Sequence, residues 1–243
     1  MRRQTGKLAT ALLFVLGACG IALGCRMLLG ELDSVRDLDR VADAVRGPDG
    51  ETNPQAMADR LPSGTAWLQV PSADIDLPLV QADPAQPDFY LRHTLDGSYS
   101  PAGTPYIDAR TSMGSQHILA YGHHLTGIGG MFSNLQKCYR QDEFKRRCSQ
   151  GLFLTTPTPE TTRRHMEALC AMTVDKSYSP IQRFAWRDDE DFRSWLTTLA
   201  NESTARSPDW EDLINGATHA TTLVTCSSDI GGQRARTLVV FVS

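Results

Sequence analysis

The strongest constraint on the fold is a succession of short apolar runs, broken by turn-forming residues, that starts near Trp67 and continues to the end of the sequence. The runs are rich in β-branched and aromatic residues and are separated by Gly, Pro, Asp and Ser, which is the pattern of strands joined by turns. Eight of them can be read: TAWLQV, IDLPLV, TPYID, HILAY, LFLTT, MEALCAMTV, TTLVTC and TLVVFV. This pattern predicts a mostly β barrel or sandwich.

Two stretches with helical spacing interrupt the predicted strands. The first is a short helix marked by Met131, Phe132, Leu135 and Tyr139. The second is marked by Phe192, Trp195, Leu196 and Leu199. Four consecutive acids, 188–191, precede the second stretch, and acidic residues in a first turn favour a helix start. We therefore expect two helical insertions in the β domain and assign the acids to capping.

An apolar stretch near the N-terminus predicts a membrane anchor. Leu8 to Cys25 is almost uninterrupted over 18 residues, and its extension past Arg26 to Leu29 is long enough to cross about 30 Å of hydrocarbon. Arg2, Arg3 and Lys7 precede the stretch and acids follow it, which places the tail of residues 1–7 in the cytoplasm. The sequence then predicts an anchor at 8–29 and a single-pass protein whose remaining residues lie outside the cell membrane.

Two other interpretations of this stretch remain open. A cleaved signal peptide usually has a shorter core, although Gly17, Ala18 and Cys19 loosely resemble a lipoprotein processing site. Both place the protein on the outer face of the membrane. After the anchor, apolar residues at helical spacing between Leu32 and Val45 predict an amphipathic helix that ends near Gly47. Residues 30–60 are therefore expected to be a helical stalk or linker, followed by one extracellular catalytic domain at 61–243.

Charge and cysteine usage exclude several classes of partner. The net charge is -4 and no basic stripe lies outside the N-terminal tail, which argues against nucleic acid. Outside the anchor, the four cysteines show neither CxxC nor zinc-ligand spacing: Cys138, Cys148, Cys170 and Cys226. No metal is expected. Cys138 and Cys148 are either a disulfide or two thiols, and Cys170 has the pattern of a packing residue.

A strand that ends in cysteine carries the predicted chemistry. Cys226 closes the string TLVTC, and Arg236 opens the next apolar run ten residues later. The two could meet at one sheet edge, where the guanidinium would favour a thiolate. Cys226 alone would more often be a small buried hydrophobe. The string YGHHLTGIGGMF, about a hundred residues upstream, supplies the base that a cysteine enzyme needs.

Four ordered blocks resemble class B sortases. They are WLQVPSADIDLPLVQ, DFYLRHTLDGSYSPAGTPYIDAR, ILAYGHHLTGIGGMFSNL and TLVTC with its downstream arginine. The resemblance implies an eight-stranded sortase-type β-barrel with an N-terminal helix and helical insertions. It also implies a cysteine transpeptidase of the Gram-positive cell surface that needs no cofactor. Matched to the family pattern, the catalytic residues are His123, Cys226 and Arg236.

The chemistry follows from these side chains. Cys226 would attack a peptide carbonyl to give a thioester, while Arg236 binds the oxyanion or the substrate backbone. His123 would protonate the leaving amine and then act as base when a second amine resolves the thioester. The expected partners are a surface protein with a sorting signal and an amine of the cell-wall precursor, on peptidoglycan or on a lipid-linked precursor. A pilin-polymerising sortase and an exported, mainly hydrolytic cysteine peptidase are the alternatives.

The substrate groove is less well marked. The resemblance implies Leu91, Tyr178, Ile181, Val224 and Thr225 as its lining residues. Val224 stands where class B members commonly carry Ser, and Ser227 where an acid often follows the cysteine, so a hydroxyl contact to the sorting signal is lost. The preferred signal cannot be read from the sequence.

Neighbouring residues compete for the catalytic roles. His124 follows His123, and in an extended segment the two side chains point to opposite faces, so only one of them faces Cys226. Arg234 is the rival of Arg236, and Asp229 is interpreted as a turn former. The other four histidines are expected to be ordinary surface or hydrogen-bonded residues: His93, His117, His165 and His219.

Overall fold

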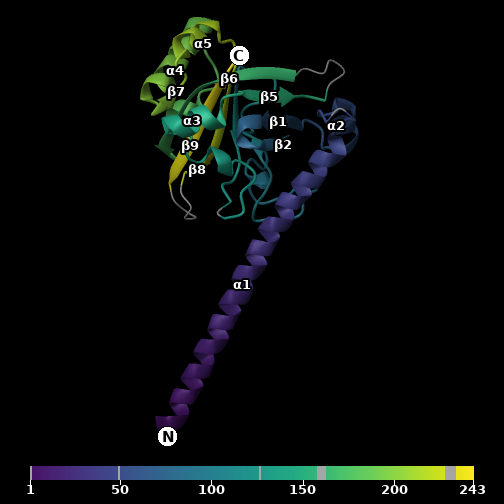
Figure 1. The fold of residues 1–243 in the computed structure, drawn as a ribbon, viewed down its shortest axis with the longest axis vertical. Coiled ribbons are helices and arrows are strands. Elements are labelled where there is room, and N and C mark those ends of the chain that lie inside the picture. The colour runs from purple at the N-terminus through teal and green to yellow at the C-terminus, as the bar shows by residue number, and fades with distance from the viewer. Residues whose placement is uncertain (1, 49, 126, 158–162, 228–233) are drawn as a thin grey trace.

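The computed structural model describes residues 2–48, 50–125, 127–157, 163–227 and 234–243, and its centre is a closed β-barrel (Figure 1). The strands are hydrogen-bonded in the order β5-β1-β2-β3-β4-β8-β9-β6, and a further pairing of β5 with β6 closes the ring. Their bounds are β1 Ala66–Val70, β2 Ile75–Gln81, β3 Tyr106–Ile107, β4 His117–Tyr121, β5 Leu152–Thr155, β6 Arg163–Asp175, β8 Ala220–Cys226 and β9 Ala235–Val242. The eight predicted strands are confirmed, and they form a barrel and not a sandwich.

Two of the strand pairings are parallel, and one of them matters for function. β2 pairs with β3 and β4 pairs with β8 in parallel, while the other neighbours are antiparallel. Parallel strands end at the same edge of a sheet. The residues that follow β4 therefore lie beside the residues that follow β8, although about a hundred residues separate the two strands in the chain.

Alternation along the strands separates two cores. In β9, Val239 and Phe241 point into the barrel, whereas Leu238, Val240 and Val242 belong to a second core on its outer face. This is the period of two that a strand imposes on its side chains. In the described residues, apolar side chains fill the barrel interior, which favours a binding site at an end of the barrel or on its surface.

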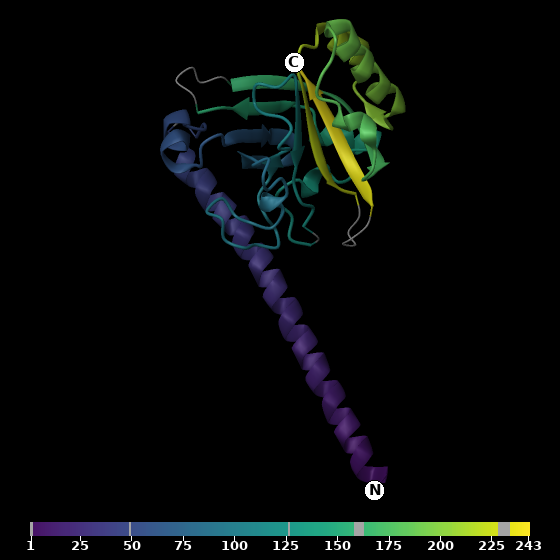
Figure 2. The same ribbon diagram turned by 180° about the vertical axis from the view of Figure 1, so that it is seen from behind.

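The outer core is covered by the predicted second insertion. α4 (Asp189–Glu202) buries Phe192, Trp195, Leu196 and Leu199 against β6, β8 and β9. Its N-cap is Asp188, whose carboxylate accepts the Asp191 N–H at 2.8 Å, so the predicted capping role is confirmed. β7 (Ala205–Arg206) and α5 (Trp210–Gly216) follow and are too short to be predicted from periodicity. Figure 2 shows α4 and α5 on the side of the barrel away from α1.

The expected helix at residues 131–139 is wrong. The segment contains only a single 3-10 turn, η3 (Ser133–Leu135), and the α-helix α3 begins later, at Gln141–Arg147. Met131 has a left-handed backbone with φ 47°, and the Phe132 N–H donates to the carbonyl of His123 and not to a helical partner. The apolar residues pack into the barrel end from an irregular segment. The remaining 3-10 turns are η1 (Pro71–Ala73), η2 (Phe89–Leu91) and η4 (Ser179–Gln182).

A single long helix, α1 (Arg2–Val45), joins the apolar N-terminal stretch to the barrel. Among the described residues it is the one helix long and apolar enough to cross a membrane, with a mean hydropathy of 1.9 in its most apolar window. Its last part is docked: Leu38, Ala42 and Val45 are buried. The expected helix that ends near Gly47 is confirmed.

A second short helix completes the N-terminal packing. α2 (Pro54–Arg60) is capped by Asn53, whose side chain accepts the N–H groups of Gln55 and Ala56. Its buried Met57 contacts Val45 of α1 and Trp67 of β1 in a small core of their own. Much of the segment predicted as stalk or linker is therefore packed against the barrel.

Candidate active site

The β8–β9 hairpin brings Cys226 and Arg236 together. The antiparallel register runs from Ala220 opposite Val242 to Cys226 opposite Arg236, which is the last pair of the ladder. Side chains that lie directly opposite each other in such a pair emerge on the same face with Cβ atoms about 5 Å apart. A partly exposed thiol therefore lies opposite an arginine at one end of the barrel.

The parallel pairing of β4 with β8 brings His123 to the same place. Tyr121 is the register partner of Val224, and the next residue, Gly122, donates its N–H to the Val224 carbonyl at 3.1 Å. His123 and Cys226 each follow two residues after this register pair.

One hydrogen bond fixes the tautomer of the neutral His123 ring. Nε2 lies 2.9 Å from the carbonyl oxygen of Leu91, and a carbonyl only accepts, so Nε2 carries the hydrogen. In the neutral ring, Nδ1 is then the free basic nitrogen. Two opposing groups of effects act on the basicity of this nitrogen.

Burial is the largest effect on the His123 pKa and lowers it below the ordinary value. The cations of Arg92 and Arg236 lower it further, while the Leu91 carbonyl and the carboxylate of Glu31 raise it. Burial and the cations outweigh the acceptors, so the imidazole is mostly neutral at neutral pH. Arg236 thus acts electrostatically on the histidine, as well as lying opposite Cys226.

The two candidate arginines are held differently. Arg236 is within the first residues of β9, and its Nη1 donates to the Ala235 carbonyl at 2.9 Å. Arg234 precedes the strand and makes a two-point ion pair with Asp175, at 2.7 and 2.6 Å. This pair holds the pKa of Asp175 well below its usual range. Arg236 therefore remains the candidate for the catalytic arginine opposite Cys226, whereas Arg234 is held in an ion pair with Asp175 of the neighbouring strand β6.

A groove of about 1110 Å³ opens over these residues. Typical small-molecule pockets hold about 300–1,000 Å³, so this space suits a peptide of several residues. Every residue that the sequence assigned to catalysis or substrate binding lines it: Leu91, His123, Tyr178, Ile181, Val224, Thr225, Cys226 and Arg236. His124 lines it as well, so the geometry of the groove does not separate the two histidines. Asp229 lies outside the described residues.

A buried segment behind the groove supports all three candidate positions, a role that the sequence analysis did not predict. The Phe132 N–H donates to the His123 carbonyl at 3.2 Å. The side-chain amide of Gln136 donates to the carbonyl of Ser227, next to Cys226, at 3.4 Å. The Gln136 carbonyl accepts the hydroxyl of Thr237, next to Arg236, at 2.6 Å. One segment therefore fixes the backbone beside each of the three residues.

A polar cluster in the groove wall was also missed. Asp108 accepts two hydrogen bonds from the Arg110 side chain, at 2.8 and 2.6 Å, and one from the Tyr121 hydroxyl at 3.1 Å. Burial and the Asp108 charge raise the pKa of Tyr121, and Arg110 holds the pKa of Asp108 below its usual value against the effect of burial. Tyr121 and Asp108 are neighbours because β3 and β4 pair, and no local sequence motif predicts that pairing.

His117, Cys138 and Cys148 are buried in the interior of the protein, outside the groove. His117 is fully buried, with its ring nitrogens 3.0 Å from the Arg183 carbonyl and from the Thr222 hydroxyl, and burial lowers its pKa to about 4. Cys138 and Cys148 are buried thiols, and their hydrogen bond raises the pKa of Cys148. Within the described ranges, no group of three or more His, Cys, Asp or Glu side chains is placed to hold a metal ion.

Comparison with known proteins identifies the fold. No family model and no curated protein matches the chain. A mutant form of sortase B from Clostridium perfringens matches with a TM-score of 0.69 at 22% identity, over 85% of this chain and 96% of that one. Sortase B from B. anthracis in complex with AAEK1 matches with a TM-score of 0.69 at 18% identity, over 88% and 98%.

Two further solved structures are complexes. Staphylococcus aureus sortase B with its substrate gives a TM-score of 0.60 at 18% identity, over 74% of this chain and 78% of that one. A sortase B in complex with triglycine also gives a TM-score of 0.60, at 17% identity, over 74% and 79%. The chain has the fold of class B sortases.

Proposed function

We propose that this chain is a membrane-anchored sortase, a cysteine transpeptidase that cleaves a sorting-signal peptide through a Cys226 thioester and transfers the acyl group to an amine. The observation that carries the proposal is the convergence of His123, Cys226 and Arg236 at one end of a sortase-type barrel, in a groove that suits a peptide. The three come from separate strand ends, and only the barrel topology brings them together.

The first half of the reaction follows from the positions of the three side chains. In the reactive form, Cys226 is a thiolate and His123 is protonated at Nδ1. The Cys226 sulfur attacks the scissile carbonyl, and the tetrahedral oxyanion that forms accepts hydrogen bonds from the Arg236 guanidinium. The C–N bond then breaks as the leaving amine takes a proton from His123 Nδ1. The thioester between Cys226 and the substrate remains.

The second half of the reaction reverses these roles. An incoming amine attacks the thioester carbonyl, and Nδ1 of His123 accepts its proton as the C–S bond breaks. A new amide forms, and the thiolate and the protonated ring are restored. In this account, Leu91 holds the ring of His123 through its carbonyl, while Tyr178, Ile181, Val224 and Thr225 contact the peptide.

Substrates are inferred from the chemistry and from the neighbours. The donor is a surface protein that carries a sorting signal, and the acceptor is an amine of the cell-wall precursor. The substrate complex of S. aureus sortase B and the triglycine complex of a sortase B support a peptide donor and an amine acceptor. Val224 contributes no hydroxyl, so the sorting signal of this chain is expected to differ at the position that it contacts.

The location is part of the proposal. Residues 8–29 would cross the cell membrane, with residues 1–7 in the cytoplasm and the barrel outside. The length and apolar character of α1 support this arrangement, as do Arg2, Arg3 and Lys7 before the span. Residues 30–60 join the span to the catalytic domain at 61–243.

The test is a ligation assay on the full chain in detergent micelles, with a library of sorting-signal peptides and an amine acceptor. Mass spectrometry should find a ligated peptide with the unchanged chain and none with Cys226→Ala. Arg236→Lys should lower kcat/KM about 10²-fold, the size of the effect of losing an oxyanion donor, while the matched Arg234→Lys should change it little.

Two results would contradict the proposal. Dominant hydrolysis with saturating amine would mean that the protein is a peptidase. Ligation that survives Cys226→Ala would mean that another residue is the nucleophile.

A further inference from the structure

The N-terminal helix fixes the height of the groove above the membrane. The exposed apolar part of α1 ends at Leu29, and Glu31, only two residues later, lines the groove. A helix rises about 1.5 Å per residue, so the wall of the groove begins about 3 Å beyond the last apolar residue. The headgroup layer extends about 5–7 Å beyond the hydrocarbon on each side. The mouth of the groove therefore lies at headgroup level if α1 spans the bilayer.

Two contacts prevent the barrel from turning about the helix. The Ser34 hydroxyl is hydrogen-bonded to that of Ser100, and both side chains are buried. The second contact is made by the next residue of α1, Val35. The loop that follows the histidines packs closely against this side chain: a Cβ added to Gly130 would lie 3.3 Å from the Val35 methyl groups. The same turn of α1 thus contacts two separate loops of the domain and sets which face of the domain meets the membrane.

The exposed apolar side chains gather at this face. In the part of the chain that the structure describes, the large hydrophobic residues exposed outside α1 are Leu91 and Tyr99, at 37% and 67%. Both belong to the segment of residues 88–100, here called the rim. Tyr99 adjoins Ser100 and so lies near the level of Ser34, about 7.5 Å beyond Leu29 along the helix. This level is at the outer edge of the headgroup layer. Tyrosine is enriched at headgroup level in membrane proteins, where its ring meets apolar groups and its hydroxyl meets water.

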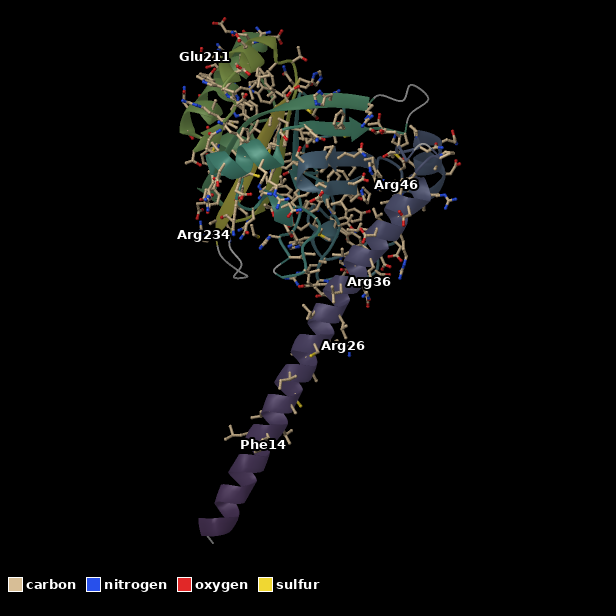
Figure 3. The ribbon with its side chains drawn as sticks, viewed as in Figure 1. Phe14, Arg26, Arg36, Arg46, Glu211 and Arg234 are labelled. Carbon is tan, nitrogen blue, oxygen red and sulfur yellow. The ribbon has the colours of Figure 1, made fainter. Side chains whose placement is uncertain are left out.

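The rim is ordered and is joined to the catalytic base. His93 forms an isolated bridge with Tyr99, and their rings lie 6.0 Å apart, while the Ser100 N–H donates to the Arg92 carbonyl at 2.9 Å. At its other end the Leu91 carbonyl accepts the hydrogen bond of His123. Figure 3 places Arg234, the residue before β9, at the end of the domain from which α1 leaves, and Glu211 at the opposite end.

We propose that the rim rests on the lipid headgroups beside α1, with Tyr99 as its interfacial contact, so that the groove opens along the membrane surface. This rests on the proposed membrane anchoring. Asp88, Arg92 and Asp96 give the rim both signs of charge, so the contact depends on the Tyr99 ring and forms on zwitterionic lipid. The groove is then supplied by molecules held at the membrane surface, with their reacting groups within the headgroup layer.

The experiment measures the depth of Tyr99 directly. The full chain, with Cys19, Cys25 and Cys226 replaced by Ala, carries a fluorophore at Tyr99→Cys or, as the matched control, at Glu211→Cys. Both forms are reconstituted in phosphatidylcholine nanodiscs with and without a spin label on the lipid headgroup. Quenching should be severalfold stronger at position 99 than at position 211. Equal quenching at the two positions would overturn the proposal.

A second measurement separates this inference from the proposed function. Tyr99→Asp in the otherwise unchanged chain should leave ligation of a soluble peptide intact and lower ligation of a lipid-tethered peptide severalfold, whereas Tyr99→Phe should retain both. Equal loss on both peptides would contradict a membrane role for Tyr99. If the unchanged chain ligates no soluble peptide, the proposed function fails, and the quenching result still decides where the rim lies.

Discussion

At the scale of residues, two charged neighbours outside the catalytic motifs change the basicity of His123 in opposite directions. Glu31 on α1 raises the pKa of the imidazole and Arg92 on the rim lowers it, while burial keeps the value below that of a free histidine. Neither residue is in the catalytic motifs. The charge state of the proposed general acid therefore depends on the packing of the N-terminal helix and of the rim around the groove.

These two neighbours give a matched pair of variants. Glu31→Gln removes a carboxylate that stabilises the imidazolium, so the His123 pKa should fall further and the fraction of protonated ring at pH 6 should decrease. Arg92→Gln removes a cation and should raise the pKa. Titration of the His123 ring protons by NMR measures both, and shifts of the same sign in the two variants would contradict the assignment.

The pH dependence of activity should follow the same signs. A general acid is lost as the pH rises through its pKa, so the alkaline limb that His123 imposes on thioester formation should move to lower pH in Glu31→Gln. In Arg92→Gln it should move to higher pH. Rates of thioester formation measured across the pH range check both shifts, and His123 titration in each variant is the control.

The residues that could be predicted from the sequence are those that stand at the ends of strands. Cys226, Arg236 and His123 each stand at the end of a recognisable apolar run, and strand pairing then brought them together. Glu31 could not be predicted, because its place in the groove depends on how a helix docks. The ion pair of Arg234 with Asp175 was also hidden, since 59 residues separate the two and only the β6–β9 pairing joins them.

At the scale of elements, the turn after β4 is tightly packed against the segment that supports the site. A Cβ on Gly122 would lie 2.6 Å from the ring of Phe132, which is fully buried. The sequence showed the glycine within YGHH but not its neighbour, because the Phe132 segment was expected to be helical. In the structure it is an irregular loop that donates to the His123 backbone.

Gly122→Ala should therefore destabilise the fold and disturb the site. Overpacking of a filled core costs about 1–3 kcal/mol, and the displaced Phe132 would shift His123, so activity should fall together with stability. Gly114→Ala is the control, because the nearest contact of its Cβ would be the Ser112 hydroxyl, at 3.9 Å. Urea unfolding gives the free energies, and equal changes for both variants would show that the Phe132 contact is relaxed easily.

At the scale of the whole molecule, the segment between anchor and barrel is part of the folded unit. Leu38, Ala42 and Val45 of α1 are buried, and Met57 of α2 packs with Val45 against Trp67. The amphipathic spacing predicted a helix here but left open whether it was a free stalk or docked. The face of the barrel that this helix covers depends on β1 and β2, and the apolar spacing within the helix carries no information about those strands.

A truncation measures the contribution of this segment. A protein of residues 30–243 should be more stable than one of residues 61–243, by at least the roughly 2–5 kcal/mol that removal of one large buried side chain costs. Thermal unfolding compares the two, and Leu38→Ala in the longer protein should lie between them. Equal melting temperatures would mean that α1 and α2 contribute no stability to the barrel.

The position of β9 in the barrel has a consequence for when the protein can act. This strand, Ala235–Val242, lies between β8 and β6 and carries Arg236. Its pairing with β6 joins residues that are far apart in the chain, and contacts so distant in sequence form late in folding. The barrel therefore closes and Cys226 gains Arg236 as its neighbour in the same event, so a chain in which β9 has not yet paired has no assembled candidate site.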